Sequence, residues 1–175
     1  MTTEIILAGF GGQGILFAGK LLAYAGMLKG CEVSWLPSYG PEMRGGTANC
    51  NVIISDKPIA SPIIQKPTVL IALNGPSLEK FINSVAPGGV VIYDSSLIST
   101  KIERDDITVV PVPATQIAVD MNASTLANMV TLGKLSTVDE TITADEMKDA
   151  LKKLVPAKKA DLLELNLTAI DKGIN

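Results

Sequence analysis

Histidine is absent from this 175-residue chain, and cysteine occurs only twice, as Cys31 and Cys50. The two cysteines lie far apart and form no Cys-x-x-Cys motif, so the chain offers almost no ligands for zinc or an iron–sulfur cluster. No Ser-His or Cys-His dyad can form, and acid–base chemistry would need a carboxylate, lysine, cysteine or tyrosine with a shifted pKa. These absences argue against a metal site and against a self-sufficient hydrolase. We assign no catalytic residue.

The chain also lacks an excess of positive charge and any long apolar run. It has 15 basic and 18 acidic residues, a net charge of −3, which argues against nucleic acid as a partner. No apolar segment reaches the roughly 18–20 residues of a membrane helix, and no secretory signal is visible. Because 47% of the residues are hydrophobic, the chain can fill the core of one domain. We expect a soluble, cytoplasmic protein with reduced thiols.

A glycine-rich turn follows the first predicted strand. Residues 4–8 form an apolar run typical of a buried parallel strand, and residues 9–14 read Gly-Phe-Gly-Gly-Gln-Gly. The helix expected next places Ile15, Ala18 and Leu22 on one face. Free amides at such a helix N-terminus favour an anion such as a phosphate. The alternative is that these glycines only permit tight packing of the strand against the helix.

The second predicted strand, residues 32–36, tests whether this turn belongs to a dinucleotide site. In dinucleotide-binding folds this strand ends in an acidic residue that holds a ribose hydroxyl, or lies near an arginine for a 2′-phosphate. Here Pro37 and Ser38 occupy that position, and Glu42 and Arg44 follow within an irregular loop. This departure argues against NAD(P) binding.

The loop at residues 37–46 holds a tyrosine, a glutamate, an arginine, two prolines and three glycines. A surface loop of this composition commonly binds something. Arg44 suits a phosphate or carboxylate partner, or it pairs locally with Glu42 in a solvated loop. The next strand, residues 47–55, is expected to form a hairpin or edge extension with residues 59–62. On it, Asn49 and Asn51 point to one face, as site donors or as ordinary edge polars, while Cys50 points to the core.

The remaining pattern predicts a Rossmann-like α/β fold with a mostly parallel sheet and helices on both faces. Strands are expected at 68–73, 90–94 and 107–113, the last at an edge because of its prolines. Asn74 and Asp94 end two of these strands, as ligand contacts or as cap and turn residues. A capping box at 143–146 opens a C-terminal helical segment, whose last helix has apolar residues on more than one side. We predict a single domain, 1–175, with an α/β core at 1–135 and a helical extension at 136–175.

Three motifs together resemble a known family. They are the Gly-x-Gly-Gly-Gln-Gly turn at 9–14, the Pro-Ser-Tyr-Gly-Pro-Glu-Met-Arg-Gly-Gly-Thr-Ala-Asn-Cys segment at 37–50, and the Ile-Ser-Asp-Lys-Pro-Ile-x-Ser-Pro segment at 54–62. The combination resembles the gamma subunit of 2-oxoacid:ferredoxin oxidoreductases, which include pyruvate, 2-oxoglutarate and 2-oxoisovalerate enzymes. The resemblance covers essentially the whole chain.

The resemblance implies a division of labour among subunits. Partner alpha and beta subunits would carry thiamine diphosphate and magnesium, and a ferredoxin-like delta subunit would carry iron–sulfur clusters. The assembly would cleave a 2-oxoacid, release carbon dioxide, reduce ferredoxin and form an acyl-coenzyme A. This chain lacks the Gly-Asp-Gly…Asn-Asn signature of thiamine enzymes, so we expect it to be inactive alone, to bind no cofactor by itself, and to contact coenzyme A or shape the active site.

Two other functions are weighed against the subunit interpretation. A stand-alone Rossmann-type nucleotide-binding or regulatory module, and a nicotinamide oxidoreductase, are both disfavoured by the missing acid after the second strand. The residues predicted to contact a cofactor or partner are Gly9, Gly11, Gly12, Gln13, Gly14, Ser38, Tyr39, Gly40, Glu42, Arg44, Gly45, Gly46 and Asn49.

Overall fold

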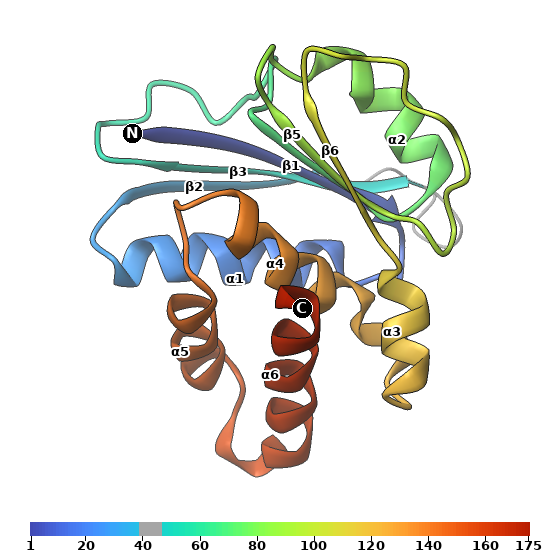
Figure 1. Cartoon of the computed structure of the whole chain (residues 1–175). Helices are drawn as coiled ribbons and strands as arrows, with labels where there is room; N and C mark the ends of the chain where they lie inside the picture. The colour runs from blue at the N-terminus through green and yellow to red at the C-terminus, as the bar shows by residue number, and fades with distance from the viewer. Residues whose placement is uncertain (39–46) are drawn as a thin grey trace.

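The computed structural model describes residues 1–38 and 47–175, and a six-stranded sheet forms the centre of this part (Figure 1). The strand order is β2-β3-β1-β4-β5-β6. β1, β4, β5 and β6 are parallel neighbours, while β3 runs antiparallel to both β1 and β2. The mostly parallel α/β sheet predicted from sequence is therefore confirmed. The strands are β1 (Thr2–Phe10), β2 (Glu32–Ser38), β3 (Thr47–Ser55), β4 (Val69–Ala72), β5 (Val90–Asp94) and β6 (Thr108–Val112).

Helices cover both faces of the sheet, as expected, but very unequally. α2 lies on one face, and the other helices lie on the opposite face (Figure 1). The helices are α1 (Ile15–Leu28), α2 (Gly75–Phe81), α3 (Ala114–Asp120), α4 (Ala127–Val138), α5 (Ala144–Leu154) and α6 (Ala160–Ile174), with short 3-10 turns η1 (Ile82–Ser84), η2 (Ser124–Leu126) and η3 (Ala157–Lys159).

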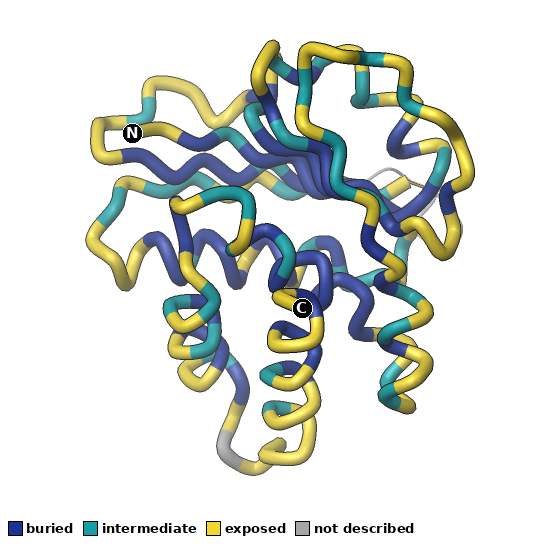
Figure 2. Tube along the Cα trace, in the orientation of Figure 1, coloured by how far each residue is buried: buried dark blue, intermediate teal, exposed yellow. Residues whose placement is uncertain are grey.

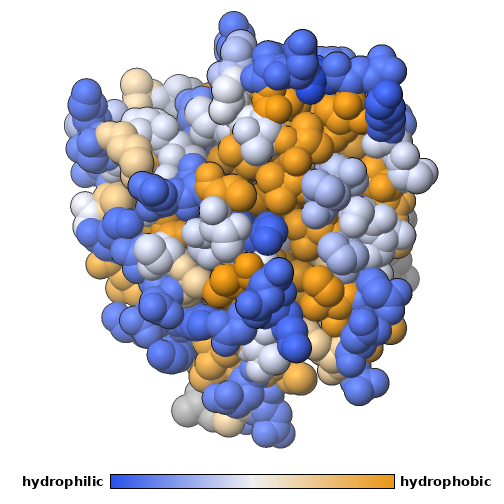
Figure 3. All heavy atoms as spheres, viewed as in Figure 1, coloured by the Kyte–Doolittle hydropathy of each residue, from blue (hydrophilic) through white to orange (hydrophobic). Residues whose placement is uncertain are grey.

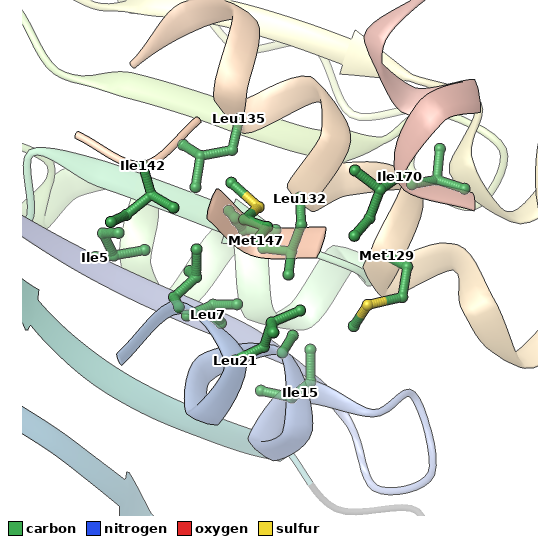
Figure 4. Close-up of a cluster of buried hydrophobic side chains, with 14 of the residues drawn as sticks. Ile5, Leu7, Ile15, Leu21, Met129, Leu132, Leu135, Ile142, Met147 and Ile170 are labelled. Carbon is green, nitrogen blue, oxygen red and sulfur yellow. The ribbon is translucent and has the colours of Figure 1, made fainter. Parts of the chain in front are cut away.

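The sheet separates two hydrophobic cores, and the side chains of β1 alternate between them. Ile5 and Leu7 point into the larger core beneath α1, α4, α5 and α6, whereas Ile6 and Ala8 point into the smaller core beneath α2. Figure 4 shows Leu7 near Leu21 and Ile5 near Ile142, all within the larger core. Figure 2 shows the central strands buried along their length. Burial on both faces explains the uninterrupted apolar run in the sequence.

The position of β3 corrects one expectation. Residues 47–55 are not an edge extension, because β3 lies inside the sheet with its whole length paired to β1 and most of it paired to β2. Residues 59–62 form no strand. Pro58 precedes this segment and Pro62 ends it, and neither proline has a backbone N–H donor for strand pairing. β3 also separates β1 from β2, so these two parallel strands do not pair with each other.

β2 forms one edge of the sheet and β6 forms the other. The prolines of β6 predicted its edge position. β6 pairs only with β5 within the described chain, and Pro111 is exposed. Figure 3 shows apolar side chains gathered over this part of the sheet in the upper half of the view. Leu97, in the segment that follows β5, is 53% exposed. Val109 and Val110 on β6 are half-buried. A proline on an exposed edge removes a donor that another strand could pair with.

The C-terminal helices pack on the domain itself. The capping box is confirmed, since the Thr143 hydroxyl accepts from the Glu146 amide (3.2 Å) and Glu146 accepts from the Thr143 amide (2.8 Å). α6 crosses α4 where Gly173 faces Gly133. Docking on the domain thus uses part of the apolar surface of α6. The larger core runs continuously from β1 to α6 (Figure 4), and a boundary at residue 135 stays a prediction. No helix in the described ranges is long and apolar enough to span a bilayer.

Cys50 on β3 faces α1 and is fully buried, as its place in the strand predicted. Burial raises the pKa of its thiol to about 12. Alkylation requires the thiolate, so at pH 8 we expect iodoacetamide to modify the half-buried Cys31 and leave Cys50 intact in the native chain. Mass spectrometry would check this, with the urea-unfolded chain as the control in which both cysteines react. Rapid modification of native Cys50 would contradict its burial.

Candidate functional site

Both predicted loops begin or end at one edge of the sheet. In the strand register Phe10 at the end of β1 lies opposite Thr47 at the start of β3, and Asn49 lies opposite both Ala8 and Ser38. This is the carboxyl edge of the parallel strands, where open α/β sheets bind ligands. Six predicted site residues lie outside the described part of the chain, namely Tyr39, Gly40, Glu42, Arg44, Gly45 and Gly46.

Two glycines of the first turn require their glycine identity for different reasons. Gly12 (φ +96°) and Gly14 (φ +71°) are both left-handed. No described residue lies within 4 Å of a Cβ placed on Gly12, so this position is open within residues 1–38 and 47–175, whereas a Cβ on Gly14 would overlap the Asn128 amide. Gly9 is tight as well, with a Cβ 2.6 Å from Gln13 Oε1. Of the three, Gly12 is the position where a ligand can approach the backbone.

Gln13 holds the turn in place. Its Oε1 accepts a hydrogen bond from the Phe10 amide (2.6 Å), and its Nε2 donates to the carbonyl of Leu73 at the end of β4 (3.0 Å). Both ends of the side-chain amide are therefore bonded to the protein's own backbone. Gln13 positions the turn between β1 and β4, and the turn offers a ligand its backbone rather than this side chain.

Asn128 on α4 also supports the turn, although sequence patterns assigned it no role. Its Nδ2 donates to the carbonyl of Gly14 (3.0 Å), and its Oδ1 accepts from the Met129 amide (2.9 Å). The residue is 4% exposed. A single side-chain amide within a mainly apolar helical run, Leu126 to Leu132, is the signal that could have identified it.

Replacing Asn128 with alanine should destabilise the fold and loosen the glycine turn. We expect the free energy of unfolding to fall by about 1–3 kcal/mol, because a buried hydrogen-bonded amide is lost next to the α1 N-terminus. Urea unfolding would measure the loss, and faster amide exchange at Gly14 and Ile15 would localise it. Lys134→Ala, on the same helix, serves as the control. Unchanged exchange at the turn in Asn128→Ala would show that Asn128 does not hold it.

A groove of about 320 Å³ opens beside this turn, on the α1 face of the sheet. Gly12, Gly14 and Phe17 form one wall, and Leu162, Lys159 and Asn166 of the C-terminal segment form the other. α1 has no side-chain cap and no acidic residue in its first turn, so within the part of the chain that the structure describes its first amides have no side-chain acceptor. These amides and the nearby lysine suit an anion, and the groove's mainly apolar lining suits a ligand with a hydrocarbon portion.

Ser38 and Asn49 belong to the other face of the sheet. They line a separate pocket beneath α2, together with Asn51. The structure therefore brings the predicted site residues to one edge but divides them between two faces. The polar residues at the ends of β4 and β5 have structural roles. Asn74 caps α2 by accepting from the Ser77 amide (2.8 Å), and Asp94 accepts from Thr115 and the Ser96 amide. The cap or turn interpretation of Asp94 is confirmed. The described residues contain no group of three potential metal ligands.

The sheet order, the glycine turn and the open helix N-terminus at its carboxyl edge define a Rossmann-like α/β protein suited to an anionic ligand. Residues 4–175 match the family model for pyruvate ferredoxin/flavodoxin oxidoreductase, and the chain belongs to this family.

Proteins of similar sequence support the same family assignment. The chain is 39% identical to the 2-oxoglutarate synthase subunit KorC of Methanocaldococcus jannaschii, over 99% of this chain and 92% of the relative. It is 40% identical to the ketoisovalerate oxidoreductase subunit VorA of Methanothermobacter thermautotrophicus, over 97% of this chain. The chain spans only 35% of the length of that VorA subunit.

Solved structures share the fold over nearly the whole chain. The gamma subunit of a keto/oxoacid ferredoxin oxidoreductase from Geobacter sulfurreducens superimposes with a TM-score of 0.86 at 28% identity, covering 99% of this chain and 94% of that subunit. A 2-oxoglutarate:ferredoxin oxidoreductase from Magnetococcus marinus, solved with 2-oxoglutarate, coenzyme A and succinyl-CoA bound, gives a TM-score of 0.90 at 30% identity, covering 99% of this chain and 30% of that one.

Proposed function

We propose that this chain is the gamma-type subunit of a thiamine-diphosphate-dependent, coenzyme-A-acylating 2-oxoacid:ferredoxin oxidoreductase. The observation that carries the proposal is the open glycine turn at the carboxyl edge, in a chain of this family. The similarity to KorC over 92% of that subunit's length supports a separate subunit, and the Magnetococcus relative supports coenzyme A as a ligand of the assembly.

Coenzyme A fits the chemistry of the turn. Its phosphates are anions for the first amides of α1 and for Lys159, while its pantetheine arm is partly apolar, like the groove lining. Gly12 leaves room for a phosphate to approach the backbone, and Gln13 and Asn128 hold the turn from behind. When bound, coenzyme A supplies the thiol that accepts the acyl group. The turn and groove would orient its phosphate end from this subunit.

The other cofactors belong to partner subunits in this proposal. The sequence has no thiamine-binding signature, no histidine and only two separate cysteines, and the described residues hold no candidate metal cluster. Thiamine diphosphate and magnesium would reside in alpha and beta subunits, and iron–sulfur clusters in a ferredoxin-like delta subunit, with ferredoxin as acceptor. The gamma-type chain contributes one wall of the coenzyme A site and no reacting group.

Co-expression of a tagged chain with the candidate partner subunits encoded beside it tests this assignment. We expect the tag to recover the partners and an activity that reduces a viologen dye only when both a 2-oxoacid and coenzyme A are present. The chain alone should show no such activity. Recovery of the chain without partners, together with tight binding of a free nucleotide, would replace the proposal with a stand-alone nucleotide-binding module.

A further inference from the structure

A second pocket, of about 260 Å³, lies under α2 on the opposite face of the sheet from the glycine-turn groove. Ser38 comes from β2, Asn49 and Asn51 come from β3, and Lys80 comes from α2. Ile64 and Phe81 supply apolar parts of the wall. The pocket therefore combines polar groups from three separate elements with a hydrophobic floor, which is the usual make-up of a small-molecule site.

The polar side chains of this pocket have no partner among the described residues. Across residues 1–38 and 47–175, the side chains of Ser38, Asn49 and Asn51 make no hydrogen bond to the protein, and no carboxylate forms an ion pair with Lys80. Asn49 and Asn51 are two apart on β3, so both amides face the pocket while Cys50 between them faces α1. Unused donors gathered on one wall indicate a ligand that accepts hydrogen bonds.

The charge of the side chains that line the pocket narrows the class of ligand. Lys80 is the cation of the lining, and no acidic side chain of the described chain lines the pocket. The Lys80 ammonium lies 5.1 Å from the centroid of the Phe81 ring, a cation–π contact that holds it at the pocket wall. An anion would gain one ionic contact and amide hydrogen bonds, and the apolar floor would take a short hydrocarbon chain.

We propose that this pocket binds a small organic carboxylate of a few carbon atoms. The carboxylate would lie between Lys80 and the amides of Asn49 and Asn51, and its carbon chain would lie against Ile64 and Phe81. The volume of the pocket admits such a molecule. The site is separate from the coenzyme A groove, because β1 and β3 lie between them, and it does not depend on the proposed subunit function.

Titration of the full-length chain with isobutyrate, followed by NMR of asparagine side-chain amides, tests the proposal. We expect saturable shifts of the Asn49 and Asn51 amide signals with isobutyrate and none with isobutyramide, its neutral isostere. Lys80→Met should weaken isobutyrate binding about tenfold or more, since a charge-assisted contact is removed. Lys20→Met, on the exposed side of α1, is the matched control and should bind like the wild type.

Thermal melting distinguishes loss of the binding site from loss of the folded state. Both variants should melt at the wild-type temperature, since Lys80 and Lys20 are exposed; if Lys80→Met does not fold, Lys80→Arg, which keeps the charge, should retain saturable binding. Non-saturating shifts, equal shifts with isobutyramide, or unchanged affinity in Lys80→Met would each overturn the carboxylate site.

Discussion

Replacing Gly133 with alanine should lower the stability of the chain by at least about 2 kcal/mol. A Cβ at Gly133 would overlap the carbonyl oxygen of Ile170, and one at Gly173 would overlap the carbonyl oxygen of Val130. Both obstacles are helix backbone, which cannot rotate aside, so the cost should reach the roughly 3 kcal/mol found for severe overpacking. That exceeds the roughly 1 kcal/mol that alanine gains over glycine in a helix.

The measurement is urea unfolding, with limited proteolysis to report whether α6 has detached from α4. Gly75→Ala is the control, because no described residue lies within 4 Å of a Cβ placed there and α2 begins at that residue. It should leave stability unchanged or raise it by up to about 1 kcal/mol. If Gly133→Ala unfolds like the wild type, α4 and α6 do not cross at these two glycines.

Local patterns predicted most elements of the fold. The uninterrupted apolar runs of β1, β4 and β5 were recognisable because these strands are buried on both faces. The capping box located the start of α5, and the prolines of β6 located an edge. Each of these signals is a short-range property of the chain, which explains why sequence alone could reveal it.

Strand order was less accessible, because pairing depends on contacts far apart in sequence. β3 was predicted at an edge from its polar start and the turn that follows it, yet it lies between β1 and β2. Its half-buried residues, Asn49 and Asn51, look like edge residues because the wall of the α2-side pocket leaves them partly open. The alternation of polar and apolar residues on β3 therefore results from a pocket wall and not from an edge position in the sheet.

The sequence predicted the location of the candidate site more accurately than the contacts that its residues make. The register brings both loops to one edge, as expected. However, the roles of Gln13 and Asn128 depend on partners 60 and 114 residues away. Gly12 belongs to the α1 face because its turn leads into α1. The face of Asn49 follows from strand pleating, which becomes informative only once β3 is placed beside β1. Contact of these residues with a cofactor or partner stays a prediction.

Gly12→Asn should raise the KM for coenzyme A of the reconstituted assembly about tenfold or more. Asparagine tolerates the left-handed backbone (φ +96°) better than other residues with a side chain, so the turn should keep its shape. The added side chain would occupy the open space over the α1 N-terminus where the proposal places a phosphate. Loss of one charge-assisted contact of roughly 1.5–3 kcal/mol corresponds to at least a tenfold change.

Steady-state kinetics at saturating 2-oxoacid would measure this effect, and the KM for the 2-oxoacid should not change. Gly88→Asn is the matched control, because Gly88 has the same left-handed backbone (φ +77°) and open surroundings but lies before β5, at the opposite end of the sheet. It should leave both KM values as they are. A wild-type KM for coenzyme A in Gly12→Asn would remove the turn from the coenzyme A site. Failure of Gly12→Asn to recover its partner subunits would instead show that the turn is a subunit contact, because the only change is a side chain at a position that is open within the described part of the chain.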